Sequence, residues 1–216
     1  MLALAFKPSE TDLKLLCLGA HSDDLEIGCA GSILDWLTRY PNAEVTWVVF
    51  SAAGLRAREA RESADELLRG AKRVNIVLHE LRDGFFPAQF EEAKQLFETI
   101  KNTMDPNVIL THRLEDRHQD HRLVAELTWQ TFRDHFVLEY EIPKYEGDLG
   151  QPGVYVALSE SAAQRKIDHL QRYFGSQRSK TWFRPETFSG LMRLRGIECR
   201  AESGCAEAFH ARKIRL

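Results

Sequence analysis

Apolar residues follow two different periods along the first two-thirds of the chain. Short apolar runs bounded by glycine or polar residues predict buried strands, and apolar residues spaced by three and four predict helices. The predicted strands cover residues 13–19, 44–51, 73–78, 107–111 and 136–142. The predicted helices lie between them, at residues 31–39, 56–69, 90–104 and 121–134. This alternation predicts a three-layer α/β/α, Rossmann-like fold with a mainly parallel sheet and right-handed crossovers.

The pattern changes at residues 147–153, where Gly-Asp-Leu-Gly-Gln-Pro-Gly breaks any regular element. Short strands are predicted at residues 154–158 and 204–210, and helices at residues 161–174 and 186–195. A segment of this length hardly holds a core of its own without disulfides or metals. We therefore predict one domain over residues 1–216, in which residues 147–216 extend the sheet and wall the site.

Composition and charge narrow the class of protein. The chain has 216 residues, enough for one substantial α/β core. Its net charge of −3 and its dispersed basic residues speak against a nucleic-acid partner. Residues 1–6 are apolar but lack the basic start and the length of a signal peptide, and no apolar run reaches the length of a membrane span. The four cysteines show no C-x-x-C spacing. A reduced, cytoplasmic protein is the simplest account, and no interface stripe decides whether it forms a homo-oligomer.

A first polar cluster follows the strand predicted at residues 13–19. Residues 21–24 read His-Ser-Asp-Asp and stand where open α/β sheets place their ligands. His21 and Asp24 are three residues apart, close enough to converge on one ion. The alternative is a solvated loop with an aspartate capping the following helix. The loop has no Gly-x-Gly-x-x-Gly, so a dinucleotide cofactor is not expected.

A second polar cluster, at residues 111–121, also follows a short strand and enters a helix. It reads Thr-His-Arg-Leu-Glu-Asp-Arg-His-Gln-Asp-His and contains three of the chain's eight histidines. A close pair of ligands with a distant third is the usual layout of a catalytic zinc site. The alternative is a polar helix entry in which His112 and His118 are ordinary surface residues. Taken together, the two clusters favour a metal site.

Both clusters carry a family resemblance. Residues 20–24, Ala-His-Ser-Asp-Asp, resemble the Ala-His-Pro-Asp-Asp signature of the LmbE-like (PIG-L) family of metal-dependent N-acetylglucosaminyl deacetylases. Residues 116–121, Asp-Arg-His-Gln-Asp-His, resemble that family's second signature, Asp-x-His-x-Asp-His. The motifs occur in the family's order and spacing, and the resemblance extends over most of the chain. Ser22 replaces the usual proline and Leu25 stands where many members carry glutamate, which we interpret as subfamily traits that leave the substrate open.

The expected metal ligands are His21, Asp24 and His121. Zn²⁺ is the expected ion, although a set of nitrogen and oxygen ligands also accepts Fe²⁺, Co²⁺ or Mn²⁺. The resemblance implies that Asp23 is the general base and that His118, ideally as an imidazolium, stabilises the oxyanion. Spacing alone does not separate Asp23 from Asp120. We expect Asp120 to hold either His118 or a ligand imidazole in its tautomer.

The implied reaction is hydrolysis of the N-acetyl group of an N-acetylglucosamine-type sugar conjugate, a small-molecule substrate. Arg56 and Arg58 follow another predicted strand end and are candidates to line the sugar pocket. Arg113 and Asp116 are expected to contact the substrate at the rim or to orient the loop. Two alternatives come from other classes. One is a metal-dependent phosphoesterase, which would favour a second metal, and the other is a catalytically silent sugar-binding protein on the same scaffold.

Overall fold

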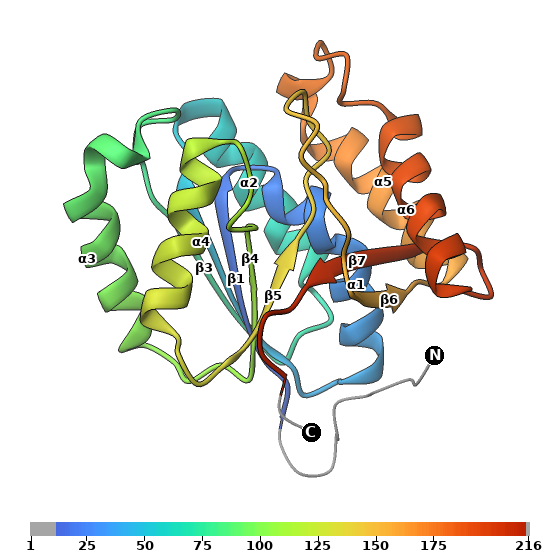
Figure 1. Cartoon of the computed structure of the whole chain (residues 1–216), viewed down its shortest axis with the longest axis horizontal. Helices are drawn as coiled ribbons and strands as arrows, with labels where there is room; N and C mark the ends of the chain where they lie inside the picture. Colours follow the sequence, from blue (N-terminus) through green and yellow to red (C-terminus); the bar gives the residue numbers. More distant parts are fainter. Residues whose placement is uncertain (1–11, 215–216) are drawn as a thin grey trace.

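A seven-stranded sheet in the order β3-β2-β1-β4-β5-β7-β6 organises the protein (Figure 1). The computed structural model describes residues 12–214, so the apolar residues 1–6 lie outside the described part. The strands are β1 Lys14–His21, β2 Glu44–Ser51, β3 Arg73–Leu78, β4 Val108–Thr111, β5 Phe136–Tyr140, β6 Val154–Ala157 and β7 Ala206–His210. The strands from β1 to β5 pair in parallel, and β7 pairs antiparallel with both β5 and β6. The α/β fold with a C-terminal extension of the sheet is therefore confirmed.

Helices cover both faces of the sheet (Figure 1). They are α1 Asp24–Arg39, α2 Gly54–Leu67, α3 Phe90–Lys101, α4 Gln119–Thr131, α5 Glu160–Tyr173 and α6 Pro185–Cys199, with short 3₁₀ turns η1 Phe86–Gln89 and η2 Gly175–Gln177. One core lies beneath α3 and α4, and a larger one lies on the other face, against α1, α2, α5 and α6. Successive residues of β1 alternate between the two cores, which explains its continuous apolar run. Across residues 12–214, none of the helices is long and apolar enough to span a lipid bilayer.

The first helix begins at Asp24, seven residues before the predicted start at residue 31. The difference arises because Gly28 resembles a loop residue in the sequence but lies inside the helix. A Cβ atom at Gly28 would lie 2.3 Å from a ring carbon of Tyr140, and one at Gly31 would lie 3.1 Å from Glu207 Oε1. Both glycines allow the sheet to approach the helix closely. The candidate metal ligand Asp24 therefore lies in the first turn of a helix rather than in a free loop.

A buried ion pair ties the last strand to the first helix. Glu207 of β7 accepts hydrogen bonds from the backbone amides of Gly31, at 3.0 Å, and Ser32, at 2.7 Å. Lys166 of α5 donates to Glu207 at 2.5 Å and to the carbonyl of Ile27 at 2.6 Å. Both charged side chains are almost fully buried. The C-terminal segment thus holds α1, which begins next to the first polar cluster, against the sheet.

Candidate metal centre

On the side that faces β4, the end of β1 is held by side chains rather than by strand pairing, whereas its other side pairs with β2 as far as His21. β1 pairs with β4 only as far as Cys17 and Leu110, whereas β1 itself continues to His21. Beyond that point the Ala20 amide donates to Nε2 of His112 at 2.9 Å. The Tyr140 hydroxyl donates to the carbonyl of Leu18 at 2.7 Å. These two bonds satisfy backbone groups that would otherwise be buried without partners, and they fix the position from which His21 projects.

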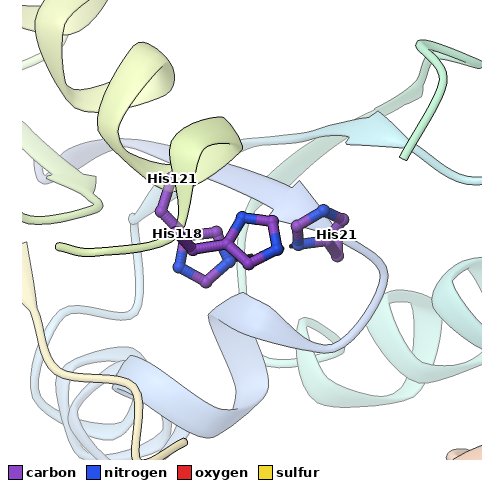
Figure 2. Close-up of side chains that lie close together, drawn as sticks. All are labelled: His21, His118 and His121. Carbon is purple, nitrogen blue, oxygen red and sulfur yellow. Dashed lines mark hydrogen bonds between the residues drawn. The ribbon is translucent and has the colours of Figure 1, made fainter. Parts of the chain in front are cut away.

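The structure brings the three predicted metal ligands together. His21 Nδ1 lies 3.1 Å from His121 Nε2, and Asp24 Oδ2 lies 3.4 Å and 3.5 Å from these two atoms. His21 comes from the end of β1, and His121 comes from the first turn of α4, next to His118 (Figure 2). In a tetrahedral zinc site with bonds of about 2.1 Å, neighbouring ligand atoms are about 3.4 Å apart. The triangle of donor atoms therefore has the size of one face of such a site.

The tautomers of the two histidines direct lone pairs into this triangle. His121 Nδ1 lies 3.0 Å from Asp116 Oδ2, and His21 Nε2 lies 3.2 Å from Asp120 Oδ2. A neutral imidazole donates its N–H to a carboxylate, so the lone pair of each ring is on its other nitrogen. Those are the two nitrogen atoms that face each other beside Asp24 Oδ2. Three lone-pair atoms at this spacing fit a divalent cation.

When no cation is bound, a proton is favoured on His21 Nδ1, between the rings of His21 and His121. Burial lowers the pKa of His21, but the charge of Asp24 and the hydrogen bond with Asp120 outweigh it and raise this pKa well above its ordinary value. Burial, reinforced by the neighbouring His112, lowers the pKa of His121 to about 3. His21 Nδ1–H then donates to His121 Nε2. The proton occupies the place of a cation.

Metal binding should therefore release a proton. The raised pKa of His21 means that its ring stays protonated to higher pH than an ordinary imidazole, so the metal competes with a proton. We expect the release of about one proton per ion near neutral pH and an affinity that falls as the pH decreases. Titration calorimetry in buffers with different ionisation enthalpies measures the number of protons. An observed enthalpy that is the same in every buffer would contradict the assignment.

Asp120 is one of two carboxylates that orient the histidines of the donor triangle. Asp120 is fully buried and accepts the amides of Gly84 and Phe86 at 2.6 Å and 3.1 Å, in addition to its contact with His21. Of the two groups that Asp120 was predicted to hold, a ligand imidazole or His118, its carboxylate contacts the candidate ligand His21. The backbone amide of Asp120 donates to His118 Nδ1 at 3.3 Å.

Asp116, which was predicted to contact the substrate at the rim or to orient the loop, is buried beneath His121. Its Oδ1 accepts the amide of His118 at 2.8 Å, and its Oδ2 contacts Lys144 Nζ at 3.1 Å as well as His121. Burial favours the neutral acid, but the hydrogen bond with His121 and nearby positive charge hold the pKa of Asp116 well below its usual range. Protein groups thus occupy both of its oxygens, and Asp116 positions His121.

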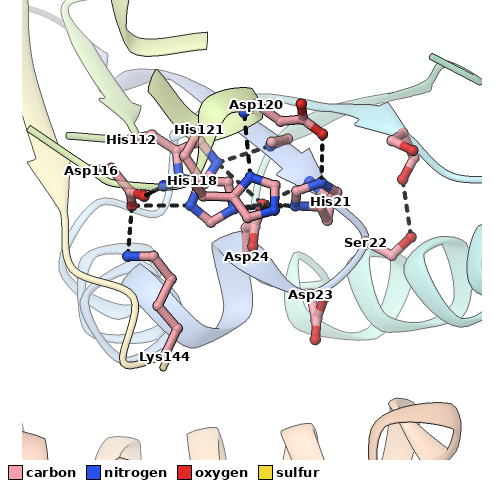
Figure 3. A network of polar contacts seen from close by, with 12 residues as sticks. His21, Ser22, Asp23, Asp24, His112, Asp116, His118, Asp120, His121 and Lys144 are labelled. Atoms are coloured by element: carbon pink, nitrogen blue, oxygen red, sulfur yellow. Dashed lines mark hydrogen bonds and ion pairs between the residues drawn. The ribbon is translucent and has the colours of Figure 1, made fainter. Parts of the chain in front are cut away.

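Asp23 lies beside the donors but faces a different partner. Burial raises the pKa of Asp23 above its ordinary value, although the charge of Arg56 opposes this. Asp23 Oδ1 is paired with Arg56, and Oδ2 is buried without a partner. Figure 3 shows the side chain directed away from the imidazoles. Arg56 is held in turn by Glu59 at 3.1 Å and Ser176 Oγ at 3.3 Å.

The other two arginines predicted to bind substrate have protein partners. Arg58 is mostly exposed on α2, where its Nε lies 3.9 Å from Glu62. Arg113 donates to the carbonyl of Asp148 at 2.7 Å and pairs with Glu115 at 3.3 Å. The structure therefore brings Arg56 to the candidate base, places Arg58 on the helix surface, and pairs Arg113 with a neighbouring loop.

His118 lies at the open side of the donors. Its ring centroid is 4.9 Å from that of His21 and 4.5 Å from that of His121. Burial, together with the positive charge of His21, lowers its pKa, which favours a neutral ring over the imidazolium that we expected. Because Nδ1 accepts the Asp120 amide, the ring proton is on Nε2.

The network around the centre contains groups that the sequence did not indicate (Figure 3). His112 was interpreted as a surface residue under the alternative reading, yet it is fully buried. Lys144 and Glu59 come from parts of the chain without a motif. Asp83 Oδ1 lies 3.1 Å from His21 Nε2.

Comparisons with known proteins concern the family and the fold of this chain. The family model PIG-L, described as GlcNAc-PI de-N-acetylase, matches residues 16–132, which is more than half of the chain and includes both motifs. The chain is similar to the 4-carboxy-2-hydroxymuconate hydratase GalB from Pseudomonas putida KT2440, with a TM-score of 0.73, 18% identity, and coverage of 94% of this chain and 98% of that one.

Two deacetylases have a similar fold. For the N,N′-diacetylchitobiose deacetylase from Pyrococcus horikoshii the TM-score is 0.65 at 18% identity, over 95% of this chain and 85% of that one. For a zinc-inhibited form of the teicoplanin deacetylase Orf2 the TM-score is 0.69 at 13% identity, over 92% and 97%. At these identities the similarity concerns the fold. The match of the family model over both motifs shows that the chain belongs to the PIG-L family.

Proposed function

We propose that the protein is a zinc-dependent hydrolase that removes the N-acetyl group from an N-acetylglucosamine-type sugar conjugate. The observation that carries this proposal is the triangle of three lone-pair donors, His21 Nδ1, Asp24 Oδ2 and His121 Nε2, with an unpaired carboxylate oxygen of Asp23 nearby. The family description and the two deacetylases of similar fold support it. Zn²⁺ suits this donor set, as do Fe²⁺, Co²⁺ and Mn²⁺.

The residues of the centre have distinct roles in this reaction. His21, Asp24 and His121 would hold the ion, which lowers the pKa of a water molecule and polarises the amide carbonyl. Asp23 removes a proton from the attacking water and returns it to the departing amine nitrogen. Its raised pKa and its partner-free Oδ2 suit this task. Since the side chain faces Arg56 in this structure, the proposal includes a turn of the Asp23 carboxylate towards the donors when substrate binds.

His118 supplies the second polar contact with the reacting group. Its Nε2–H is free to donate to the carbonyl oxygen as negative charge develops there, and a neutral ring is sufficient for this. Asp120 and Asp116 do not touch the reacting atoms. They keep His21 and His121 in the tautomers that bind an ion.

The charges near the centre favour a neutral amide over an anionic substrate. A phosphoester, or a carboxylated muconate such as the one named for the hydratase of similar fold, needs free positive charge. Arg56 and Arg113 are already neutralised by acidic side chains. In addition, every group of described residues that could hold a metal includes His21 or His121, so a second ion would have to share one of these histidines with the first. A silent sugar-binding protein would not need Asp23 and His118 beside the donors.

Amine release by the metal-loaded protein tests the proposal. We expect the chelated and reloaded protein to release amine from N-acetylglucosamine or N,N′-diacetylchitobiose, and chelation to abolish this release. Asp24→Asn should lose both metal binding and amine release, because one of three donors becomes a weak amide ligand. Stoichiometric Zn²⁺ binding with phosphoester hydrolysis or muconate hydration, and no amine release, would replace the proposed reaction. If the protein binds no metal, the assignment of the metal centre itself is wrong.

A further inference from the structure

One buried histidine contacts two of the three metal donors and the residue next to the third, without belonging to the donor triangle. His112 follows β4, and no part of it is exposed. Its Nε2 accepts the amide of Ala20, the residue directly before His21, at 2.9 Å. The same nitrogen lies 3.1 Å from Asp24 Oδ2. Its ring stacks on that of His121, with centroids 4.0 Å apart and an angle of 21° between the rings.

Packing alone does not explain an imidazole at this position. The other ring nitrogen, Nδ1, is buried and has no hydrogen-bond partner among residues 12–214, which is unfavourable. A phenyl ring would fill the same space without that cost. What the imidazole adds is an acceptor at the end of β1, where β4 has already ended and offers no backbone carbonyl. His112 therefore performs a positioning task that an apolar side chain cannot.

We propose that His112 is a positioning residue that sets the distances between the three metal donors. It fixes His21 through the neighbouring amide, limits the position of the Asp24 carboxylate by direct contact, and supports the ring of His121 by stacking. His112 is not itself a ligand, because the Ala20 N–H occupies the lone pair of Nε2. This inference rests on the metal centre of the proposed function.

Two substitutions separate the contacts of His112. His112→Phe keeps a ring on His121 but removes the acceptor for Ala20, and His112→Gln keeps an acceptor but removes the ring. Residues that orient metal ligands typically contribute about 10–100-fold to metal affinity. We expect His112→Phe to weaken Zn²⁺ binding by about 10–100-fold and His112→Gln by about 10-fold. Competition with a chromophoric chelator measures the affinity. At saturating Co²⁺, the visible spectrum of each variant should differ from that of the wild type, which reports a changed ligand geometry.

His79 provides a matched control. It directly follows β3 as His112 follows β4, and its ring is stacked at 22° on that of Phe50, with centroids 5.9 Å apart. None of the groups of described residues that could hold a metal includes it. His79→Phe should therefore leave Zn²⁺ affinity and the Co²⁺ spectrum unchanged, which controls for the general effect of replacing a half-buried histidine.

The outcomes distinguish this inference from the proposed function. If the wild type binds Zn²⁺, Asp24→Asn does not, and His112→Phe matches His79→Phe in affinity and spectrum, then the inference is wrong and the metal centre stands. If the wild type binds no Zn²⁺, both fail. Circular dichroism and thermal melting of the metal-free variants establish that they fold. If His112→Phe does not fold, His112→Gln decides, and a wild-type affinity and spectrum for it would overturn the inference.

Discussion

Asp23→Asn should lower kcat for amine release by about 10²–10⁴-fold, the usual contribution of a positioned general base. The amide has the shape of the carboxylate but does not take a proton from water. Asp23 is not one of the three converging donors, so Zn²⁺ affinity should change far less than kcat. Steady-state kinetics and a Zn²⁺ titration on the same preparation measure the two effects.

The control for this change is Arg58→Gln, which alters a mostly exposed charge on α2. We expect its kcat and KM to be those of the wild type. If Asp23→Asn retained a kcat within a few-fold of the wild type, another group would have to be the base. The Zn²⁺ affinity of Asp23→Asn is a second test. A loss of affinity as large as that of Asp24→Asn would show that Asp23 is a metal ligand and not the base.

Lys166→Met should lower the free energy of unfolding by about 3–5 kcal/mol, because removing one partner of a buried ion pair leaves an uncompensated charge. Glu207 would keep its two backbone amides but lose its cation, and the Ile27 carbonyl would lose a donor. Urea denaturation of the metal-free protein measures the loss.

Lys94→Met is the matched control, because Lys94 pairs with Glu98 on the surface of α3. It should have a much smaller effect, since surface pairs contribute little. The double variant Lys166→Met, Glu207→Gln should recover part of the stability, because no unpaired charge remains. If Lys166→Met and Lys94→Met lose the same free energy of unfolding, the buried ion pair contributes no more to stability than the surface pair does.

The sequence predicted the sheet well because its strands are continuous apolar runs between polar or glycine residues. The bounds of β2 and β3 match the predicted residues 44–51 and 73–78. The start of α1 was misplaced because a glycine needed for close packing looks like a loop glycine in the sequence. Only the contact of Gly28 with Tyr140, far along the chain, distinguishes the two cases.

The donors of the candidate centre were predictable, and most of their supports were not. His21, Asp24 and His121 belong to two dense motifs at the ends of neighbouring parallel strands, so the topology alone brings them to one edge. Lys144 is a single residue outside both motifs, and His112 lies in the second cluster but outside its Asp-x-His-x-Asp-His signature. Their roles depend on contacts between residues that are far apart in the sequence, and on where β4 ends relative to β1. The cytoplasmic location and the natural sugar conjugate stay predictions.

The hydrogen bonds from the amides of α1 to Glu207 also affect when, during synthesis, the candidate metal site takes its final shape. On the ribosome, all three donors have left the exit tunnel long before the segment that carries Glu207 is synthesised. Until that segment arrives, the helix that carries Asp24 lacks its anchor on the sheet. We expect the nascent chain to acquire tight metal affinity only after the segment that carries Glu207 has emerged and the site has its final shape.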